Sequence, residues 1–201
     1  MFIDLAPSFL VICLSYLLGS IPFGLILTKL AGAGDIRKIG SGNIGATNVL
    51  RTGNKRLAIA TLLFDLTKGA ASVLLATHLT SPSITAMAAV LVVVGHCFPC
   101  WLKFRGGKGV ATSLAAMTAL DISFGFIFTI VWMITALVWR YSSLAALSAM
   151  LACTIAGFIL TEENVMQIAV LILSALVWSR HHENIHRLLT NTENKIGTPK
   201  K

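Results

Sequence analysis

Residues 104–112 of this 201-residue chain read FRGGKGVAT and combine three glycines with two basic side chains. The segment lies where one long apolar stretch ends and the next begins. Glycines expose backbone N–H groups, Lys108 adds a positive charge, and a helix that starts just after them would point its positive end at the same place. This combination indicates a phosphate-binding loop at the edge of a membrane.

A second segment of similar character, GSGNIGATN at residues 40–48, is followed by Arg51. It offers glycine amides, the hydroxyl groups of Ser41 and Thr47, and a guanidinium that can bind two phosphate oxygens at once. Its glycine spacing matches the dinucleotide fingerprint, but that fingerprint requires a βαβ unit, and here apolar spans flank the segment. The alternative is a glycine-rich turn with helix caps and one arginine extending to the membrane surface.

A third polar segment, RHHENIHRL at residues 180–188, follows the last apolar stretch directly, so we expect it to continue that helix. Helical spacing would then place His181 and Asn184 on one face. His182 and His186 are four residues apart and could share a metal ion, but the sequence offers no evident third ligand. The alternative is a basic helix that lies on an anionic membrane surface.

Two charged residues, Asp65 and Lys68, fall inside an apolar stretch and are one helical turn apart. Ionisable residues within a membrane usually face the bundle interior and often mark function. We therefore predict that Lys68 contacts a substrate phosphate and that Asp65 orients it, with mutual neutralisation of the pair as the alternative. Ser143 follows Arg140 in a short loop, where it either caps the next helix or contacts a phosphate.

The composition places these segments in a bilayer, because 56% of the residues are hydrophobic and only 12% are charged, against about 25% charged in a typical soluble domain. We predict an all-α integral membrane protein of about seven transmembrane helices, forming one domain over residues 1–201 with a polar cytoplasmic tail at 190–201. Pro22 is expected to bend the first helix. The predicted spans are 5–28, 57–77, 84–101, 109–120, 122–139, 144–160 and 164–179.

The distribution of charge predicts the orientation of the spans, with the N-terminus outside and the C-terminus in the cytoplasm. The loops that would face the cytoplasm hold 15 of the 16 Lys and Arg residues, and Lys68 is the exception. The outer side carries four acidic residues and no basic one, as the positive-inside rule requires. These residues are Asp4, Asp121, Glu162 and Glu163. The span 109–120 is short for a hydrocarbon core of about 30 Å, so we expect a half-length or re-entrant helix there.

The three polar segments, with Gly95, His96 and Pro99 ahead of the second, resemble the three motifs of the acyl-phosphate:glycerol-3-phosphate acyltransferases, the PlsY family of bacterial inner-membrane enzymes. Length, motif order and predicted topology agree with that family over essentially the whole chain. The resemblance implies transfer of a fatty acyl group from acyl phosphate to the 1-hydroxyl of sn-glycerol 3-phosphate, which yields 1-acyl-glycerol 3-phosphate and phosphate. It also implies an active site that faces the cytoplasm.

The resemblance implies no cofactor, metal ion, nucleotide or nucleic acid, and it leaves open a loose association with other lipid-synthesis enzymes. The implied catalytic residues are His181, Asn184, Lys108 and Ser41. The implied substrate-binding residues are Gly40, Gly42, Asn43, Thr47, Asn48, Arg51, Lys68, Gly106, Gly107, Gly109, Ser143 and Arg187. Either His181 or the phosphate of the donor can accept the hydroxyl proton.

The chain departs from the family pattern in three places: Arg105 stands where lysine is common, His186 stands where lysine or arginine is frequent, and residues 191–193 replace a Gly-x-Glu sequence. Two other classes of protein remain as alternatives. A small transporter for a phosphorylated metabolite also uses basic, glycine-rich helix ends, although the two halves of the chain show no repeat. A structural subunit of a lipid-synthesis complex is the third alternative.

Overall fold

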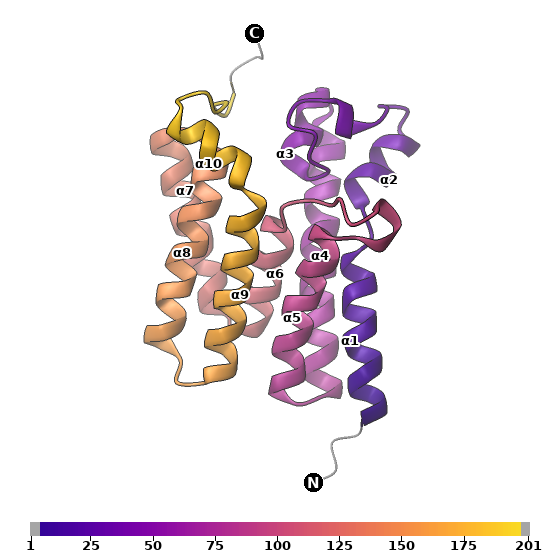
Figure 1. Cartoon of the computed structure of the whole chain (residues 1–201), viewed down its shortest axis with the longest axis vertical. Helices are drawn as coiled ribbons and strands as arrows, with labels where there is room; N and C mark the ends of the chain where they lie inside the picture. The colour runs from indigo at the N-terminus through magenta and orange to yellow at the C-terminus, as the bar shows by residue number, and fades with distance from the viewer. Residues whose placement is uncertain (1–4, 198–201) are drawn as a thin grey trace.

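The computed structural model describes residues 5–197, and these residues form helices and turns with no β-strand (Figure 1). Asp4 and residues 198–201, which include Lys200 and Lys201, lie outside the described residues. The α-helices are α1 (Leu5–Gly19), α2 (Phe23–Leu30), α3 (Ala46–Val49), α4 (Lys55–Leu79), α5 (Pro82–Cys97), α6 (Val110–Leu120), α7 (Ile122–Trp139), α8 (Ser142–Leu160), α9 (Asn164–Arg180) and α10 (His182–Leu189). Short 3-10 helices are η1 (Ile36–Lys38), η2 (Leu50–Thr52) and η3 (Cys100–Leu102).

The long helices lie side by side along one axis in two groups that α6 connects (Figure 1). Helices α1, α4 and α5 pack against one another on one side, and α7, α8 and α9 pack on the other. Helix α6 contacts α4, α5 and α7, and α5 also contacts α9. Buried side chains from most of these helices form one continuous apolar core, including Val73, Met117, Met150 and Leu173.

Glycines allow α1 and α5 to approach closely. A Cβ on Gly95 would collide with the backbone of Tyr16, and one on Gly19 would collide with the backbone of Val92. Small residues have this role in membrane bundles, where close van der Waals packing replaces the hydrophobic effect between helices. The close contact brings the end of α5 next to the end of α1.

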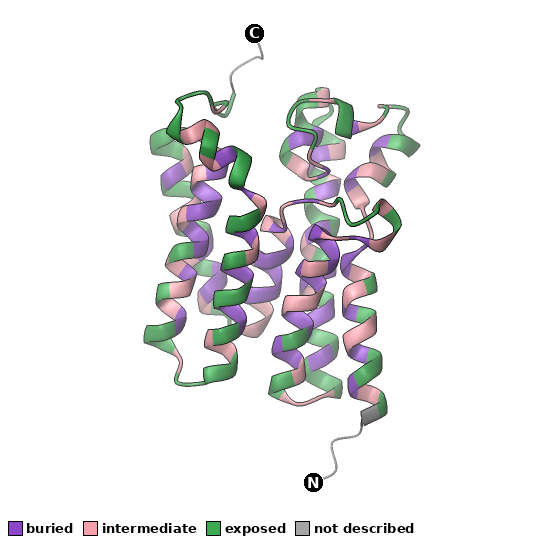
Figure 2. Cartoon of the chain, in the orientation of Figure 1, coloured by how far each residue is buried: buried purple, intermediate pink, exposed green. Residues whose placement is uncertain are grey.

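Four helical stretches, those of α4, α5 with η3, α7 and α8, are long and apolar enough to cross a membrane. Two bent pairs raise the number to 6: α1 with α2 at 44° and α9 with α10 at 62°. Helix α6, with 11 residues, is the short apolar helix that the sequence predicted. Exposed residues gather on the outer faces (Figure 2), where they include Leu137 and Ile159. The all-α membrane fold is confirmed, and the orientation of the spans stays a prediction.

Candidate active site

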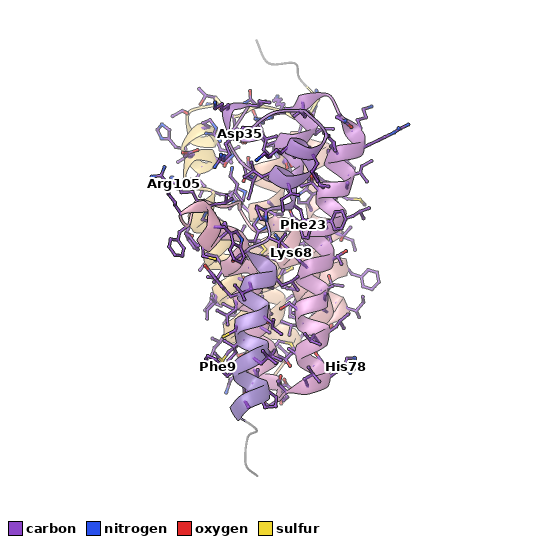
Figure 3. All side chains as sticks on the ribbon, turned by 90° about the vertical axis from the view of Figure 1, so that its right-hand side faces the viewer. Phe9, Phe23, Asp35, Lys68, His78 and Arg105 are labelled. Atoms are coloured by element: carbon purple, nitrogen blue, oxygen red, sulfur yellow. The ribbon has the colours of Figure 1, made fainter. Side chains whose placement is uncertain are left out.

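The three polar segments meet around a cleft of about 610 Å³, between α2–α3 on one side and α9–α10 on the other. Five Lys or Arg side chains line it against one carboxylate, so the cleft favours an anion. Figure 3 shows Arg105 at the same end of the molecule as Asp35, far from Phe9 and His78. The lining residues are Arg37, Ser41, Gly42, Asn43, Ile44, Trp101, Leu102, Lys103, Arg105, Gly106, Lys108, Arg180, His182 and Glu183.

Asn48 organises the first segment from within. Its side chain is 1% exposed, and its Nδ2 donates to the carbonyl of Ile36 at 2.8 Å, of Ile39 at 3.0 Å and of Asn43 at 2.8 Å. Its Oδ1 accepts from the backbone N–H of Ser41 at 3.0 Å. The amide therefore holds the turn together and has no group left for a ligand, which corrects the expectation that Asn48 binds substrate. Its neighbour Ser41 is exposed and lines the cleft.

Gly40, Thr47 and the Arg51 that follows the first segment are not among the residues that line the cleft. Gly40 has a φ of +58°, and a Cβ there would lie 2.9 Å from Nη1 of Arg51, so this glycine makes room for the arginine. Arg51 lies close enough to Lys108 for the two positive charges to repel each other. Thr47 is exposed and does not line the cleft.

The glycine amides expected to hold phosphate are already bonded to protein carbonyls. Gly106 N–H donates to Cys97 at 3.0 Å, Gly107 N–H to His96 at 3.0 Å, and Gly42 N–H to Ile39 at 3.0 Å. The expectation that these three amides are free for a ligand is therefore wrong. A Cβ on Gly106 or Gly107 would collide with the end of α5, so these glycines allow the loop to pack against that helix.

Gly109, with a φ of +79°, caps the N-terminus of α6. The first N–H groups of an α-helix have no partner within the helix. The amides of the first turn of α6, which begins at Val110, therefore replace the loop glycines as candidates for contact with an anion.

Lys108 connects the cleft to a second polar layer behind it, because its Nζ donates a hydrogen bond to Oδ1 of Asn184. Partial burial lowers the pKa of Lys108 to about 8, and the nearby charge of Arg187 acts in the same direction. The ammonium is thus incompletely solvated and paired with a neutral amide, so its positive charge is available to an anion.

Glu193 is the centre of the second layer, and it was not among the site residues predicted from the sequence. Its carboxylate accepts hydrogen bonds from Ser143 Oγ at 2.8 Å, Asn184 Nδ2 at 2.7 Å and Arg187 Nε at 2.6 Å. Burial by itself would raise the pKa of Glu193, but these hydrogen bonds outweigh it and keep the pKa below the usual value. Ser143 and Arg187, which the sequence predicted to bind substrate, both bind this carboxylate and so support Asn184; a direct contact with substrate stays a prediction. The available signal was the resemblance of Asn191-Thr192-Glu193 to the Gly-x-Glu sequence of the family, with the glutamate kept at position 193.

The tail that carries Glu193 folds back onto the bundle. Ile196 N–H donates to the carbonyl of Arg140 at 2.6 Å, and Nη2 of Arg140 donates to the carbonyl of Ile196 at 2.8 Å. The predicted polar tail is therefore docked, as far as residue 197, over the loop between α7 and α8. Because this docking joins residues far apart in the chain, sequence spacing does not reveal it.

His181 interrupts the helix that the sequence predicted to run through residues 180–188. It lies between α9 and α10, which bend by 62°. Its side chain is 3% exposed, and its ring Nδ1 lies 2.7 Å from the carbonyl of Val177. Because a carbonyl can only accept, Nδ1 is the donor and Nε2 of a neutral ring keeps a free lone pair. Lys108 is close enough for its charge to act on this imidazole.

Arg180 is a second site residue that was not predicted from the sequence. Its Nε donates to the carbonyl of Gly107 at 3.2 Å and its Nη2 to that of Gly106 at 3.3 Å. The guanidinium lies over the ring of Phe98, 5.2 Å from its centroid. It lines the cleft and ties α9 to the loop before α6. Its position at the start of the basic segment 180–188 was the available signal.

Lys68 lies outside the cleft, so the expectation that it contacts substrate phosphate is not supported by its position. Its side chain is buried, with Nζ 2.9 Å from Asp65 Oδ1 and 3.0 Å from the carbonyl of Ile21. A buried ammonium needs an opposite charge and hydrogen-bond acceptors, and this one has both. Figure 3 places it beside Phe23, near the break between α1 and α2.

The fold and site define a multi-spanning α-helical membrane protein with a basic cleft at one end. The family profile described as glycerol-3-phosphate acyltransferase matches residues 9–191. Relatives called glycerol-3-phosphate acyltransferase include one from Agrobacterium fabrum, 50% identical over 96% of this chain and 94% of its own, and one from Mesorhizobium japonicum, 54% identical over 94% and 95%. The chain therefore belongs to the glycerol-3-phosphate acyltransferase family.

Solved structures agree with this assignment. The glycerol 3-phosphate form of PlsY, an integral membrane glycerol 3-phosphate acyltransferase, superposes with a TM-score of 0.90 at 36% identity and covers 95% of this chain and 96% of its own. The lysophosphatidic acid form of PlsY gives 0.88 at 35% identity, with the same coverage.

Proposed function

We propose that this enzyme transfers a fatty acyl group from acyl phosphate to the 1-hydroxyl of sn-glycerol 3-phosphate. The observation that carries the proposal is the basic cleft on which three segments converge, each from a different part of the chain. Both substrates carry a phosphate group and one carries an acyl chain. A cleft with five cationic side chains beside the apolar residues Ile44, Trp101 and Leu102 suits both parts of the donor.

In the proposed reaction, the 1-hydroxyl oxygen of glycerol 3-phosphate attacks the carbonyl carbon of the acyl phosphate. A new ester C–O bond forms, and the C–O bond to the phosphate group breaks. The hydroxyl proton ends on the released phosphate, either directly or through Nε2 of His181. Because an acyl phosphate is already activated, orientation and charge neutralisation supply most of the catalysis.

Residues at the cleft have distinct proposed roles. Lys108 neutralises phosphate charge from the wall of the cleft, and Arg51 adds a second positive charge next to Lys108. Ser41 lines the cleft, and its hydroxyl, which donates to Oδ1 of Asn48 at 3.3 Å, exchanges that partner for a phosphate oxygen when substrate binds. The amides at the start of α6, two residues after Lys108, are candidates to bind the same anion. Asn184 holds Lys108 in place and is itself held by Glu193.

The cleft is proposed to open to the cytoplasm of a bacterium, with the protein in the inner membrane. This orientation places the basic loops inside and Asp121 outside, as the positive-inside rule requires. A cysteine at Asp121, in a variant without the four native cysteines, tests it. A membrane-impermeant thiol reagent should label this cysteine in intact cells that retain only the inner membrane, and labelling only in inverted vesicles would contradict the orientation.

The function is tested with purified protein in lipid, supplied with acyl phosphate and glycerol 3-phosphate. We expect one phosphate released for each 1-acyl-glycerol 3-phosphate formed, and no release above background without glycerol 3-phosphate. Replacing the donor with acyl-CoA should give no product. Movement of labelled glycerol 3-phosphate across a vesicle membrane without acyl transfer would contradict the proposal and support a transporter.

A further inference from the structure

Directly beneath the loop that carries Lys108 lies a buried cluster of four polar residues, Asp65, Lys68, His96 and Thr112, contributed by α4, α5 and α6. Each is at most 5% exposed. Ionisable groups at this depth in a membrane protein are costly and need a partner. The cluster takes no direct part in the proposed reaction.

One end of the buried cluster is anchored to the break between α1 and α2. Lys68 Nζ is 2.9 Å from Asp65 Oδ1 and donates to the carbonyl of Ile21 at 3.0 Å. This pair fixes the Asp65 carboxylate on the face of α4 that is turned towards α5 and α6. The carboxylate is therefore a fixed negative charge inside the bundle.

His96, in the last turn of α5, lies against this carboxylate. Its Nδ1 is 3.5 Å from Asp65 Oδ1 and 3.3 Å from Thr112 Oγ1. Two polar groups on different helices thus face the same ring nitrogen. A rotation of the ring by half a turn would put carbon in that position, so the cluster selects one orientation of His96.

The opposite edge of the same ring supports the glycine loop. A Cβ on Gly107 would collide with the His96 ring, whose Nε2 is the nearest atom. The carbonyl of His96 also accepts the N–H of Gly107 at 3.0 Å. Gly107 directly precedes Lys108, so the ring and the backbone of His96 together fix the position of the Lys108 backbone.

We propose that His96, oriented by Asp65 and Thr112, is a positioning residue that sets the place of Lys108 in the cleft. The effect on catalysis rests on the proposed function, in which Lys108 binds a substrate phosphate. A displacement of about 1 Å at such a group can lower the rate by roughly 10²-fold. The buried cluster then holds the loop in the position that places Lys108 in the cleft.

A double-mutant cycle between His96 and Gly107 tests the contact. Gly107→Ala should lower kcat/KM because the methyl group pushes the loop away from the ring, and His96→Asn should lower it because the loop loses its support. The double variant should be no worse than Gly107→Ala alone, since the smaller side chain makes room for the methyl group. Losses that simply multiply would overturn the proposal.

A second readout follows Lys108 itself, without substrate. The rate of modification of Lys108 by an amine reagent, relative to exposed Lys55, is measured by mass spectrometry. It should rise severalfold in His96→Asn, and less but in the same direction in Thr112→Val, which keeps the packing. Thr61→Val is the matched control, because Thr61 is buried on the same helix as Asp65 and bonds only to Leu57 of its own helix.

The two proposals fail in different ways. Full activity of Lys108→Ala would overturn the role of Lys108 in the proposed function, while the labelling would still report whether His96 positions the loop. Unchanged labelling of Lys108 in the folded His96 and Thr112 variants would overturn the positioning role. If His96→Asn does not fold, Thr112→Val decides the outcome.

Discussion

The cleft and the buried cluster each contain a lysine that the sequence predicted to act on a substrate phosphate, and the two regions differ in the partner they offer that lysine. Lys68 is paired with the carboxylate of Asp65, which neutralises its charge. Lys108 is bonded to Asn184, a neutral amide that orients the ammonium without neutralising it. A lysine in a membrane protein is therefore a candidate to bind an anion when its partner is neutral. Its position within a membrane span does not by itself indicate this role.

The largest effect on activity is expected from the loss of Lys108. Lys108→Ala should lower kcat/KM by about 10³-fold or more, because the phosphate loses a preorganised charge in a partly desolvated cleft. Arg51→Ala should also abolish transfer. Both variants should elute from size-exclusion chromatography as the wild type does, and Lys55→Ala is a control on an exposed lysine. Normal turnover in Lys108→Ala and Arg51→Ala would remove these residues from the site.

In the buried cluster, loss of the lysine is expected to lower the stability of the fold. Lys68→Met should destabilise the fold by about 3–5 kcal/mol, because it leaves the Asp65 carboxylate buried without a partner. Thermal unfolding in detergent measures this loss. The double variant Lys68→Met with Asp65→Leu should recover most of the stability. If Lys68→Met is stable but binds glycerol 3-phosphate poorly, the assignment of Lys68 to structure is wrong.

A smaller effect is expected at Glu193, which supports the cleft from behind. Glu193→Gln should lower kcat/KM by about 10-fold, because loss of one charge-assisted hydrogen bond costs roughly 1.5–3 kcal/mol, part of which Gln replaces. Release of the tail should also speed tryptic cleavage after Lys195. Thr192→Ala, on the exposed side of the same turn, is the matched control. Equal activity in the two variants would contradict the supporting role of Glu193.

The smallest effect is a dependence on pH. The pKa of Lys108 is about 8, so its charge is present below this value and is lost as the pH rises through it. A phosphate ester is already dianionic above its second pKa of about 6, so the substrate does not change in this range. The KM for the phosphate that Lys108 binds should rise by about five-fold from pH 8 to pH 9.

Lys108→Arg provides the control for this pH dependence. An arginine stays charged throughout the range, so the rise in KM should disappear even if the variant is slower. A rise in KM that persists in Lys108→Arg would assign the titration to another group.

The sequence predicted the helical membrane fold, because hydropathy is a local property of the chain. It also predicted that the three polar segments meet, because the charge pattern places all three on the same side of the membrane. It did not predict which donors are already bonded. Gly107 has the glycine amide that a phosphate loop requires, but its N–H meets the carbonyl of His96 across a turn. The same limit applies to Glu193, whose partners Ser143 and Asn184 are brought to it by the docking of the tail.

The most direct test of the account is protection of lysines by substrate. Each lysine is modified with an amine reagent, with and without glycerol 3-phosphate and a non-hydrolysable acyl phosphate analogue, and quantified by mass spectrometry. The account predicts that the ligands protect Lys108, that Lys55 reacts equally in both conditions and that buried Lys68 reacts in neither. Modification of Lys108 at the same rate with and without saturating ligands would contradict it.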